Sequence, residues 1–111
     1  MTTLGRNQSV TNERTKDLTP QTHTDFKHVA DDGSIIQMIV WRVPEAVPPT
    51  AHGFKYRLVY VVEGVRVVGF DNERGEGDHC HIDGEERPYF FSTVDQLIED
   101  FITEVEKRRA P

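Results

Sequence analysis

Two histidines one residue apart, His79 and His81, end the most polar stretch of the chain, DNERGEGDHCH over residues 71–81. In an extended segment, side chains two residues apart point to the same side, so both imidazoles would face one way and Cys80 the other. Because imidazole titrates near neutral pH, one ring can accept a proton while the other donates one or stabilises charge. The pair therefore suits acid–base cleavage of a phosphodiester, with Asp71 orienting a histidine. The spacing is equally compatible with two ordinary half-exposed strand residues.

Cleavage of a phosphodiester also needs cations that hold the phosphate and stabilise its developing charge. Lys55, Arg57 and Arg74 are the candidates for this role, and Tyr89 is a candidate donor or stacking surface for a base. Arg66 would belong to the same basic face. A solvated strand face would explain these cations equally well, and a core position would explain Tyr89. We therefore treat the four candidates as predicted substrate-binding residues.

The His-x-His pair could instead bind a metal ion, with Asp71 or Asp78 as a third ligand. Zinc sites use three or four ligands, and Cys80 would point away from the histidines in an extended segment. A small metal-dependent nuclease or hydrolase is therefore an alternative, whereas the leading expectation involves no metal and no other cofactor. Cys80 as a thiolate nucleophile is a weaker option, since a single cysteine in a short strand is more often a small buried residue.

The strands that must position these residues are marked by apolar runs and by predicted turns, among them Glu63-Gly64 and Asp83-Gly84. Extended segments are predicted at 25–30, 34–43, 54–62 and 65–70, with shorter candidates at 78–82 and 87–91. Ser92 or Thr93 can cap a helix in which apolar residues recur at helical spacing from Val94 to Val105. The pattern predicts an α+β fold, in which an antiparallel sheet of four to five strands is packed by one C-terminal amphipathic helix.

Composition sets the wider frame. With 111 residues the chain is expected to form one domain over residues 22–111, preceded by a flexible polar leader over residues 1–21. The formal net charge of -6 argues against binding nucleic acid through the overall field, although the acidic residues gather after residue 72 and leave the strand region near neutral. The single cysteine excludes an intrachain disulfide and favours a reducing compartment, so a cytoplasmic protein without a membrane span is expected.

Three segments between Ala51 and Phe101 resemble one known family: AHGFKYRLVYVV, GFDNERGEGDHCHIDGEERPYFF and STVDQLIEDF. They are similar to TumE-type proteins, toxin components of prokaryotic toxin–antitoxin systems, many of which carry a YDNERGKGDHxH stretch. Phe70 stands here where tyrosine is common, and Glu76 stands where lysine is common, which removes a cation beside the histidines. The resemblance implies a cytoplasmic toxin that is neutralised by an antitoxin encoded next to it, often one with a DNA-binding domain.

The leading hypothesis is therefore a toxin that acts on RNA as a metal-independent ribonuclease. His79, His81 and Asp71 are its expected catalytic residues. The ribonuclease chemistry comes from the histidines and cations, not from the resemblance. A hypothesis of another class is a non-catalytic protein-binding module, whose exposed hairpin or acidic C-terminal helix engages a partner. A homodimer is also considered, because many small proteins of this kind pair.

Overall fold

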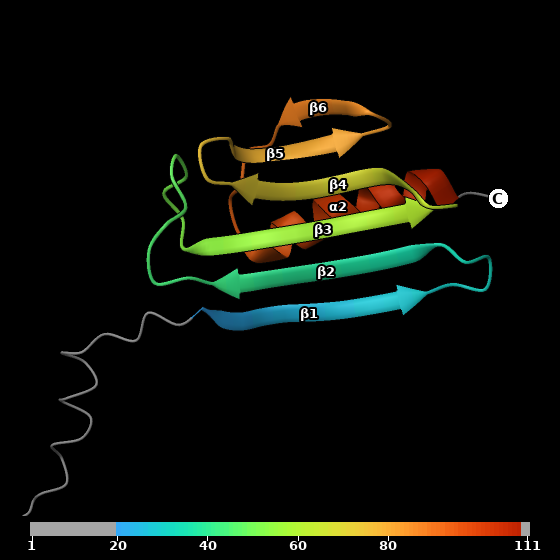
Figure 1. Cartoon of the computed structure of the whole chain (residues 1–111), viewed down its shortest axis with the longest axis horizontal. Helices are drawn as coiled ribbons and strands as arrows, with labels where there is room; N and C mark the ends of the chain where they lie inside the picture. The colour runs from blue at the N-terminus through green and yellow to red at the C-terminus, as the bar shows by residue number, and fades with distance from the viewer. Residues whose placement is uncertain (1–19, 110–111) are drawn as a thin grey trace, which may run out of the picture.

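Six strands follow one another along the chain, and each pairs antiparallel with the next (Figure 1). The computed structural model describes residues 20–109. The strands are β1 (Gln21–Val29), β2 (Ile35–Arg42), β3 (Phe54–Val62), β4 (Val65–Glu73), β5 (Gly77–Ile82) and β6 (Glu85–Pro88), and the helix α2 (Val94–Arg109) follows them. The predicted α+β class, with an antiparallel sheet and a C-terminal helix, is confirmed.

The sheet has six strands, so the prediction of four to five was wrong. The short segment predicted at 78–82 is β5, whereas β6 begins at Glu85 and shares only residues 87 and 88 with the segment predicted at 87–91. All four residues of β6 are exposed, and an edge strand of this kind needs neither an apolar face nor an alternating pattern. The sequence of β6 therefore gives little indication that it forms a strand. Most of the predicted leader, up to residue 19, lies outside the described residues.

Two tight turns set the pairing of β3 with β4 and of β5 with β6. Glu63 and Gly64 have φ angles of 52° and 79°, and Asp83 and Gly84 have φ angles of 50° and 88°. Positive φ at both central residues is the geometry of a type I′ turn, whose twist matches that of the strands it joins. Both turns were predicted from these residue pairs, and both are confirmed.

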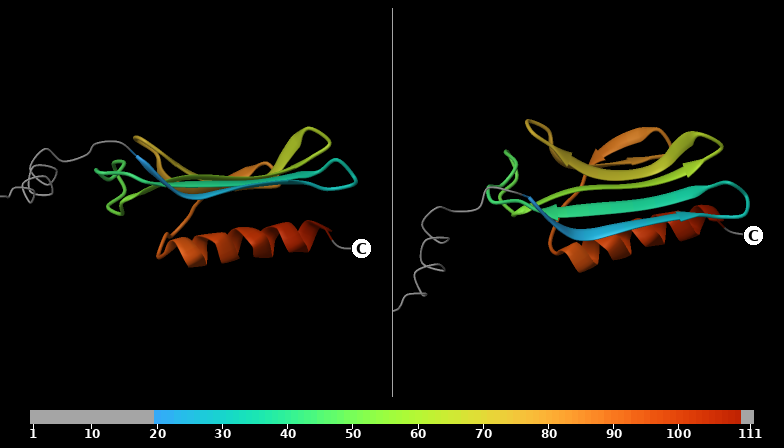
Figure 2. Two further views of the ribbon diagram at one scale, coloured as in Figure 1. Left: turned by 90° about the horizontal axis from the view of Figure 1, so that it is seen from below. Right: turned by 60° about the horizontal axis from the view of Figure 1, so that its bottom comes forward.

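The helix α2 lies across one face of the sheet (Figure 2). Thr93 caps it as predicted, because its Oγ1 accepts a hydrogen bond from the backbone N–H of Gln96 at 3.1 Å. The buried residues of α2 recur at the predicted helical spacing: Val94, Leu97, Phe101 and Val105. They form one core with alternate residues of the sheet, among them Ile36, Val40, Leu58, Tyr60, Val68, Phe70 and Ile82. Among the described residues α2 is neither long nor apolar enough to cross a membrane.

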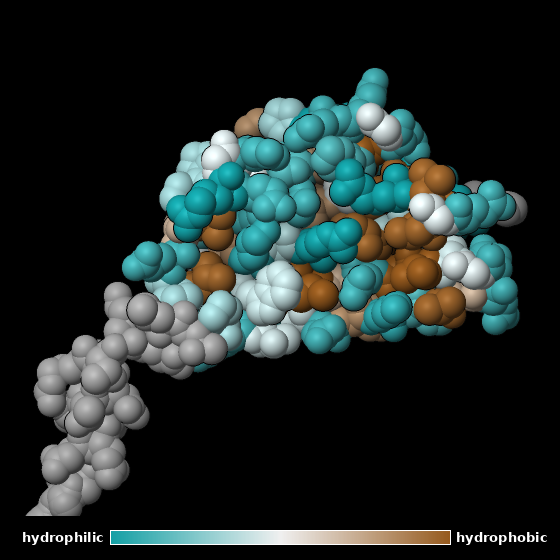
Figure 3. All heavy atoms as spheres, in the orientation of Figure 1, coloured by the Kyte–Doolittle hydropathy of each residue, from teal (hydrophilic) through white to brown (hydrophobic). Residues whose placement is uncertain are grey.

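The opposite side of the sheet, which we call the bare face, is not covered by any helix of residues 20–109 (Figure 2). Because side chains alternate along a strand, the residues between the core positions point to the bare face. Arg57, Asp71 and His79 form one row across β3, β4 and β5 on this face. Hydrophilic side chains dominate the face over β4 and β5, whereas hydrophobic ones gather toward the β1–β2 and β3–β4 turns (Figure 3).

Candidate active site

Asp71, His79 and His81 lie next to one another on the bare face. The register of β4 and β5 pairs Asp71 with His79 and Gly69 with His81. Asp71 Oδ1 lies 2.6 Å from His79 Nε2, and the two imidazole centroids are 5.3 Å apart with their planes at 78°. Cys80 lies on the opposite side, in the core beneath α2. The predicted orientation of the two histidines away from Cys80 is therefore confirmed.

His79 is held from two sides and is nearly inaccessible, with 7% of its side chain exposed. Its Nδ1 lies 3.1 Å from the carbonyl oxygen of Gly77. A carbonyl oxygen only accepts, so Nδ1 carries the hydrogen of this bond, and Nε2 of the neutral ring is an acceptor. Because the ring is enclosed, His79 can orient other groups but cannot itself reach a large substrate. His81 is half-buried and is the more accessible of the two histidines.

The contact between Asp71 and His79 is short but poorly aligned for a hydrogen bond. Asp71 Oδ1 is buried and has no hydrogen bond of acceptable geometry within the described part of the chain, although His79 Nε2 lies 2.6 Å away. A carboxylate oxygen and a neutral imidazole Nε2 are both acceptors. Two acceptors at this distance repel each other unless a proton or a metal ion lies between them.

Two further carboxylates surround the same imidazole nitrogen. Glu86 Oε2 lies 3.8 Å and Glu76 Oε1 lies 4.0 Å from His79 Nε2, and both side chains are more than half exposed. Glu86 is also the cross-strand partner of His81. Glu86 was not among the predicted site residues. The turn at Asp83-Gly84 could have indicated Glu86 as a neighbour of His81, because a two-residue turn that pairs residue 82 with residue 85 also pairs residue 81 with residue 86.

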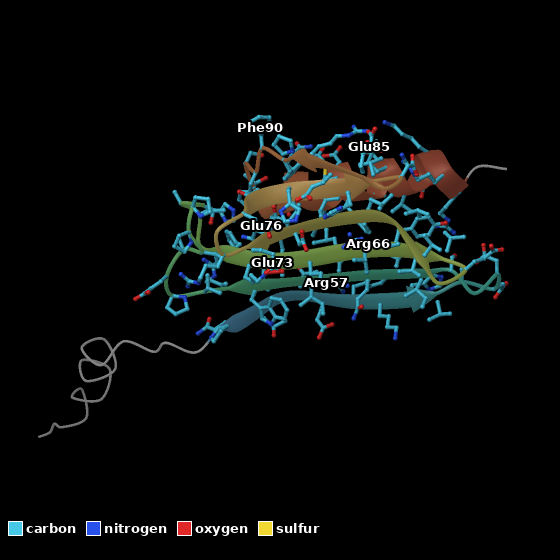
Figure 4. All side chains as sticks on the ribbon, turned by 45° about the horizontal axis from the view of Figure 1, so that its top comes forward. Arg57, Arg66, Glu73, Glu76, Glu85 and Phe90 are labelled. Carbon is cyan, nitrogen blue, oxygen red and sulfur yellow. The ribbon has the colours of Figure 1, made fainter. Side chains whose placement is uncertain are left out.

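Two arginines provide positive charge on the bare face. Arg57 is the cross-strand partner of Asp71. Arg66 extends over Gly69, since a Cβ at Gly69 would lie 2.9 Å from Arg66 Cδ, and Gly69 pairs with His81. Figure 4 shows both arginines, with Glu73 and Glu76, on strands β3 and β4 and the following turn. Arg66 was predicted only as part of a basic face. Gly69 could have indicated its position, because a glycine inside a strand often marks a place where another group approaches the backbone closely.

Neither arginine is neutralised by a nearby acid: no ion pair of Arg57 or Arg66 occurs among residues 20–109. Lys55 is different, because its Nζ donates to the carbonyl oxygen of Asn72 and lies 3.7 Å from Glu73 Oε2. Lys55 therefore holds the end of β4. Arg74 lies in the β4–β5 turn and lines a surface hollow with Pro44 and Val47, away from the histidines.

Tyr89, a predicted substrate-binding residue, does not join the site. Its hydroxyl donates to Asp100 Oδ2 of α2 at 2.6 Å, and its ring packs edge-on against Phe70 at 5.0 Å. Burial and the hydrogen bond to Asp100 raise the pKa of Tyr89 above its usual value, so the phenol stays protonated. The structure places Tyr89 on the side of the sheet covered by α2, where it helps to attach the helix.

A second Asp–His pair lies on the side of α2. Asp78 Oδ1 accepts a hydrogen bond from the buried Tyr56 hydroxyl at 2.6 Å and lies 2.8 Å from His52 Nε2. The ring of His52 stacks on Phe91 with centroids 3.9 Å apart. Burial and the bond to Asp78 raise the pKa of Tyr56, so it remains a neutral donor. The pair ties the loop before β3 to β5, and the stacking of His52 on Phe91 ties the same loop to the segment before α2, which gives the pair a structural role.

Within residues 20–109, the fold and the site define a small α+β protein in which one helix, α2, covers one face of the sheet and the other face presents a histidine–carboxylate cluster between arginines. A family model described as toxin TumE matches residues 4–109, nearly the whole chain. The chain therefore belongs to the TumE toxin family, as the resemblance implied. No curated protein and no solved structure matched the chain.

Proposed function

We propose that this protein is the toxin of a prokaryotic toxin–antitoxin pair and that it cleaves RNA on the bare face. Membership of a toxin family supports the first part. The observation that carries the second part is the placement of Asp71, His79 and His81 beside two arginines without ion pairs among residues 20–109. An extended single strand can lie across such an open sheet with its phosphates at the cations.

His81 is the best candidate for proton transfer, because it is the accessible histidine of the pair. Cleavage needs a group that takes the proton of the attacking hydroxyl and a group that protonates the leaving oxygen. Glu86, the cross-strand partner of His81, offers the carboxylate that takes the proton of the attacking hydroxyl, and His81 in its protonated form would protonate the leaving oxygen. Arg57 and Arg66 would stabilise the charge that develops on the phosphate. In this route His79 and Asp71 position His81 and do not transfer the proton themselves.

The toxin role also supports a partner and a compartment. The partner is an antitoxin encoded next to the toxin, of the kind that often carries a DNA-binding domain. The compartment is the cytoplasm, where reducing conditions suit the free and buried thiol of Cys80. The homodimer stays a prediction.

We expect His81→Ala to relieve growth arrest and RNA loss after tightly controlled induction in a bacterial host. His79→Ala should do the same, because it removes the imidazole that lies between Asp71 and His81. The matched control is His28→Ala, which removes an exposed histidine of β1. Growth and total RNA are compared at equal expression. Continued arrest with intact RNA in all variants would contradict the ribonuclease and favour a non-catalytic binding module.

A second expectation concerns the cations. Arg57→Gln and Arg66→Gln should each weaken RNA binding and reduce the slope of log K against log salt by about 0.7, the value for one phosphate contact on a single strand. Arg74→Gln should leave the slope unchanged, because this side chain lies at the β4–β5 turn. Binding is measured by fluorescence anisotropy with labelled RNA and catalytically inactive His81→Ala protein. If Arg57→Gln and Arg66→Gln leave the salt slope at the wild-type value, as Arg74→Gln is expected to do, the bare face is not the RNA-binding surface.

A further inference from the structure

We infer that Asp71, His79 and His81 bind one divalent transition-metal ion, with Zn²⁺ as the reference ion. One ligand atom from each of these side chains lies within 4.8 Å of the other two. Two imidazole nitrogens and one carboxylate oxygen make a donor set that borderline metals prefer. Sites with only three protein ligands keep a position open for water or substrate, as catalytic zinc sites do.

The unsatisfied contact between Asp71 and His79 is the first argument for an ion. His79 is buried, its Nδ1 bonds to the carbonyl oxygen of Gly77, and its Nε2 lies 2.6 Å from the buried Asp71 Oδ1, which has no hydrogen bond among the described residues. Metal-binding histidines commonly donate their other ring N–H to a backbone carbonyl, which fixes the tautomer and aims the free nitrogen at the ion. His79 has this arrangement. An ion bound to both Nε2 and Oδ1 would replace the repulsion of two acceptors by two coordinate bonds.

The charge around His79 is the second argument. Asp71, Glu76 and Glu86 place three carboxylates within 4.0 Å of one imidazole nitrogen. Glu76 and Glu86 also form a second set of ligand atoms with His79. Carboxylates this close repel one another, and a bound cation removes that repulsion. Such a cation would also make the cluster compatible with a phosphate, which three carboxylates would otherwise repel.

Binding an ion requires the three side chains to adjust. Zinc lies about 2.0–2.1 Å from nitrogen ligands, which places neighbouring tetrahedral ligand atoms roughly 3.3 Å apart. The contact of 2.6 Å between Asp71 and His79 would therefore lengthen by roughly 0.7 Å, and ligand atoms of the set that lie up to 4.8 Å apart would move closer together. Cys80 is no ligand, since its side chain lies in the core on the opposite side of the sheet. Mg²⁺ is a poor occupant because it prefers oxygen ligands only.

A catalytic role for this ion rests on the proposed function, whereas its binding does not. Bound beside Arg57 and Arg66, the ion would polarise a phosphate oxygen as a Lewis acid. This assignment favours the metal-dependent alternative of the sequence analysis over the metal-independent route. His81 would then be a ligand at the accessible edge of the site, in place of the proton-transfer role that it has in the metal-independent route.

Isothermal titration of ZnCl₂ into the chelator-treated full chain tests the inference. We expect one equivalent of Zn²⁺ to bind, with no comparable signal from MgCl₂. His81→Ala and Asp71→Asn should each weaken binding on the order of tenfold or more, in line with the loss of a group that a metal site requires. His28→Ala should bind as wild type does. Circular dichroism confirms that each variant is folded.

The outcomes separate the metal site from the ribonuclease. If the wild type binds no Zn²⁺, or if His81→Ala and His28→Ala bind it equally, the inference is wrong and the Asp71–His79 contact is an ordinary ion pair. If Zn²⁺ binds as expected but RNA is not cleaved with or without it, the metal site is supported and the proposed ribonuclease activity is contradicted. RNA cleavage that persists unchanged in a folded protein shown to be metal-free would overturn the catalytic role of the ion.

Discussion

Asp71→Asn should abolish toxicity while leaving the free energy of unfolding nearly unchanged, and Asp78→Asn should do the reverse. Both residues face a histidine, but on opposite sides of the sheet: Asp71 meets His79 on the bare face, and Asp78 meets His52 beneath the aromatic rings. Asparagine keeps the shape of aspartate and loses its charge. The pair of variants therefore compares the same chemical change in a functional and in a structural setting.

The expected sizes follow from what each carboxylate does. Loss of the Asp71 charge removes the group that orients His79 or binds the proposed ion, so activity should fall on the order of 10²-fold or more. The buried Oδ1 of Asp71 has no well-aligned hydrogen bond among the described residues, so little stability depends on it. Asp78 accepts from the buried Tyr56 hydroxyl and pairs with His52. Weakening this network should cost about 1–3 kcal/mol.

Urea unfolding, followed by the fluorescence of the only tryptophan, Trp41, gives the stability of both variants. Growth after induction gives their activity at matched soluble levels. Full toxicity of Asp71→Asn would remove this residue from the active site. Loss of stability in Asp71→Asn equal to that in Asp78→Asn would mean that the carboxylate on the bare face supports the fold and not the chemistry.

Phe101→Ala is expected to lower the free energy of unfolding by about 3–5 kcal/mol. Phe101 is fully buried at the centre of α2 and meets the ring of Phe70 edge-on at 6.0 Å. Because α2 is the one helix that covers the sheet within residues 20–109, a cavity here weakens the attachment of the whole second layer. Such a loss is a large part of the stability of a domain this size.

Phe90→Ala is the control for this prediction, since the Phe90 side chain is 87% exposed and its removal should change stability by less than about 0.5 kcal/mol. Both variants are measured by urea unfolding at one temperature. Similar midpoints for the two variants would contradict the packing of α2 on the sheet.

The helix and the long hairpin could be predicted because their signals are local. Apolar residues from Val94 to Val105 follow the helical period, and Thr93 bonds to the first turn. The turn residues Glu63 and Gly64 separate two apolar runs, so the β3–β4 pair was evident. β6 could not be recognised with the same ease, because all its residues are exposed and its pairing with β5 does not depend on an apolar pattern.

The same distinction holds for the candidate site. The shared side of His79 and His81 follows from the two-residue period of a strand, so the sequence was enough. The contact of Glu86 with His79 depends on the register of the strands, and the approach of Arg66 to Gly69 depends on the conformation of the Arg66 side chain. Neither follows from the strand period alone. Tyr89 comes after the end of β6, where the strand period no longer tells which side of the sheet a residue faces.

The order of the strands also sets how fast the chain can fold. Each strand pairs with its neighbour in sequence, and the longest connection between paired strands runs from residue 43 to residue 53. Contacts between residues close in sequence cost little loop-closure entropy, so this sheet should form faster than a β-sandwich of the same length. A newly synthesised toxin would then become active soon after translation. Under the proposed function, an antitoxin would therefore have to be present before the toxin is made.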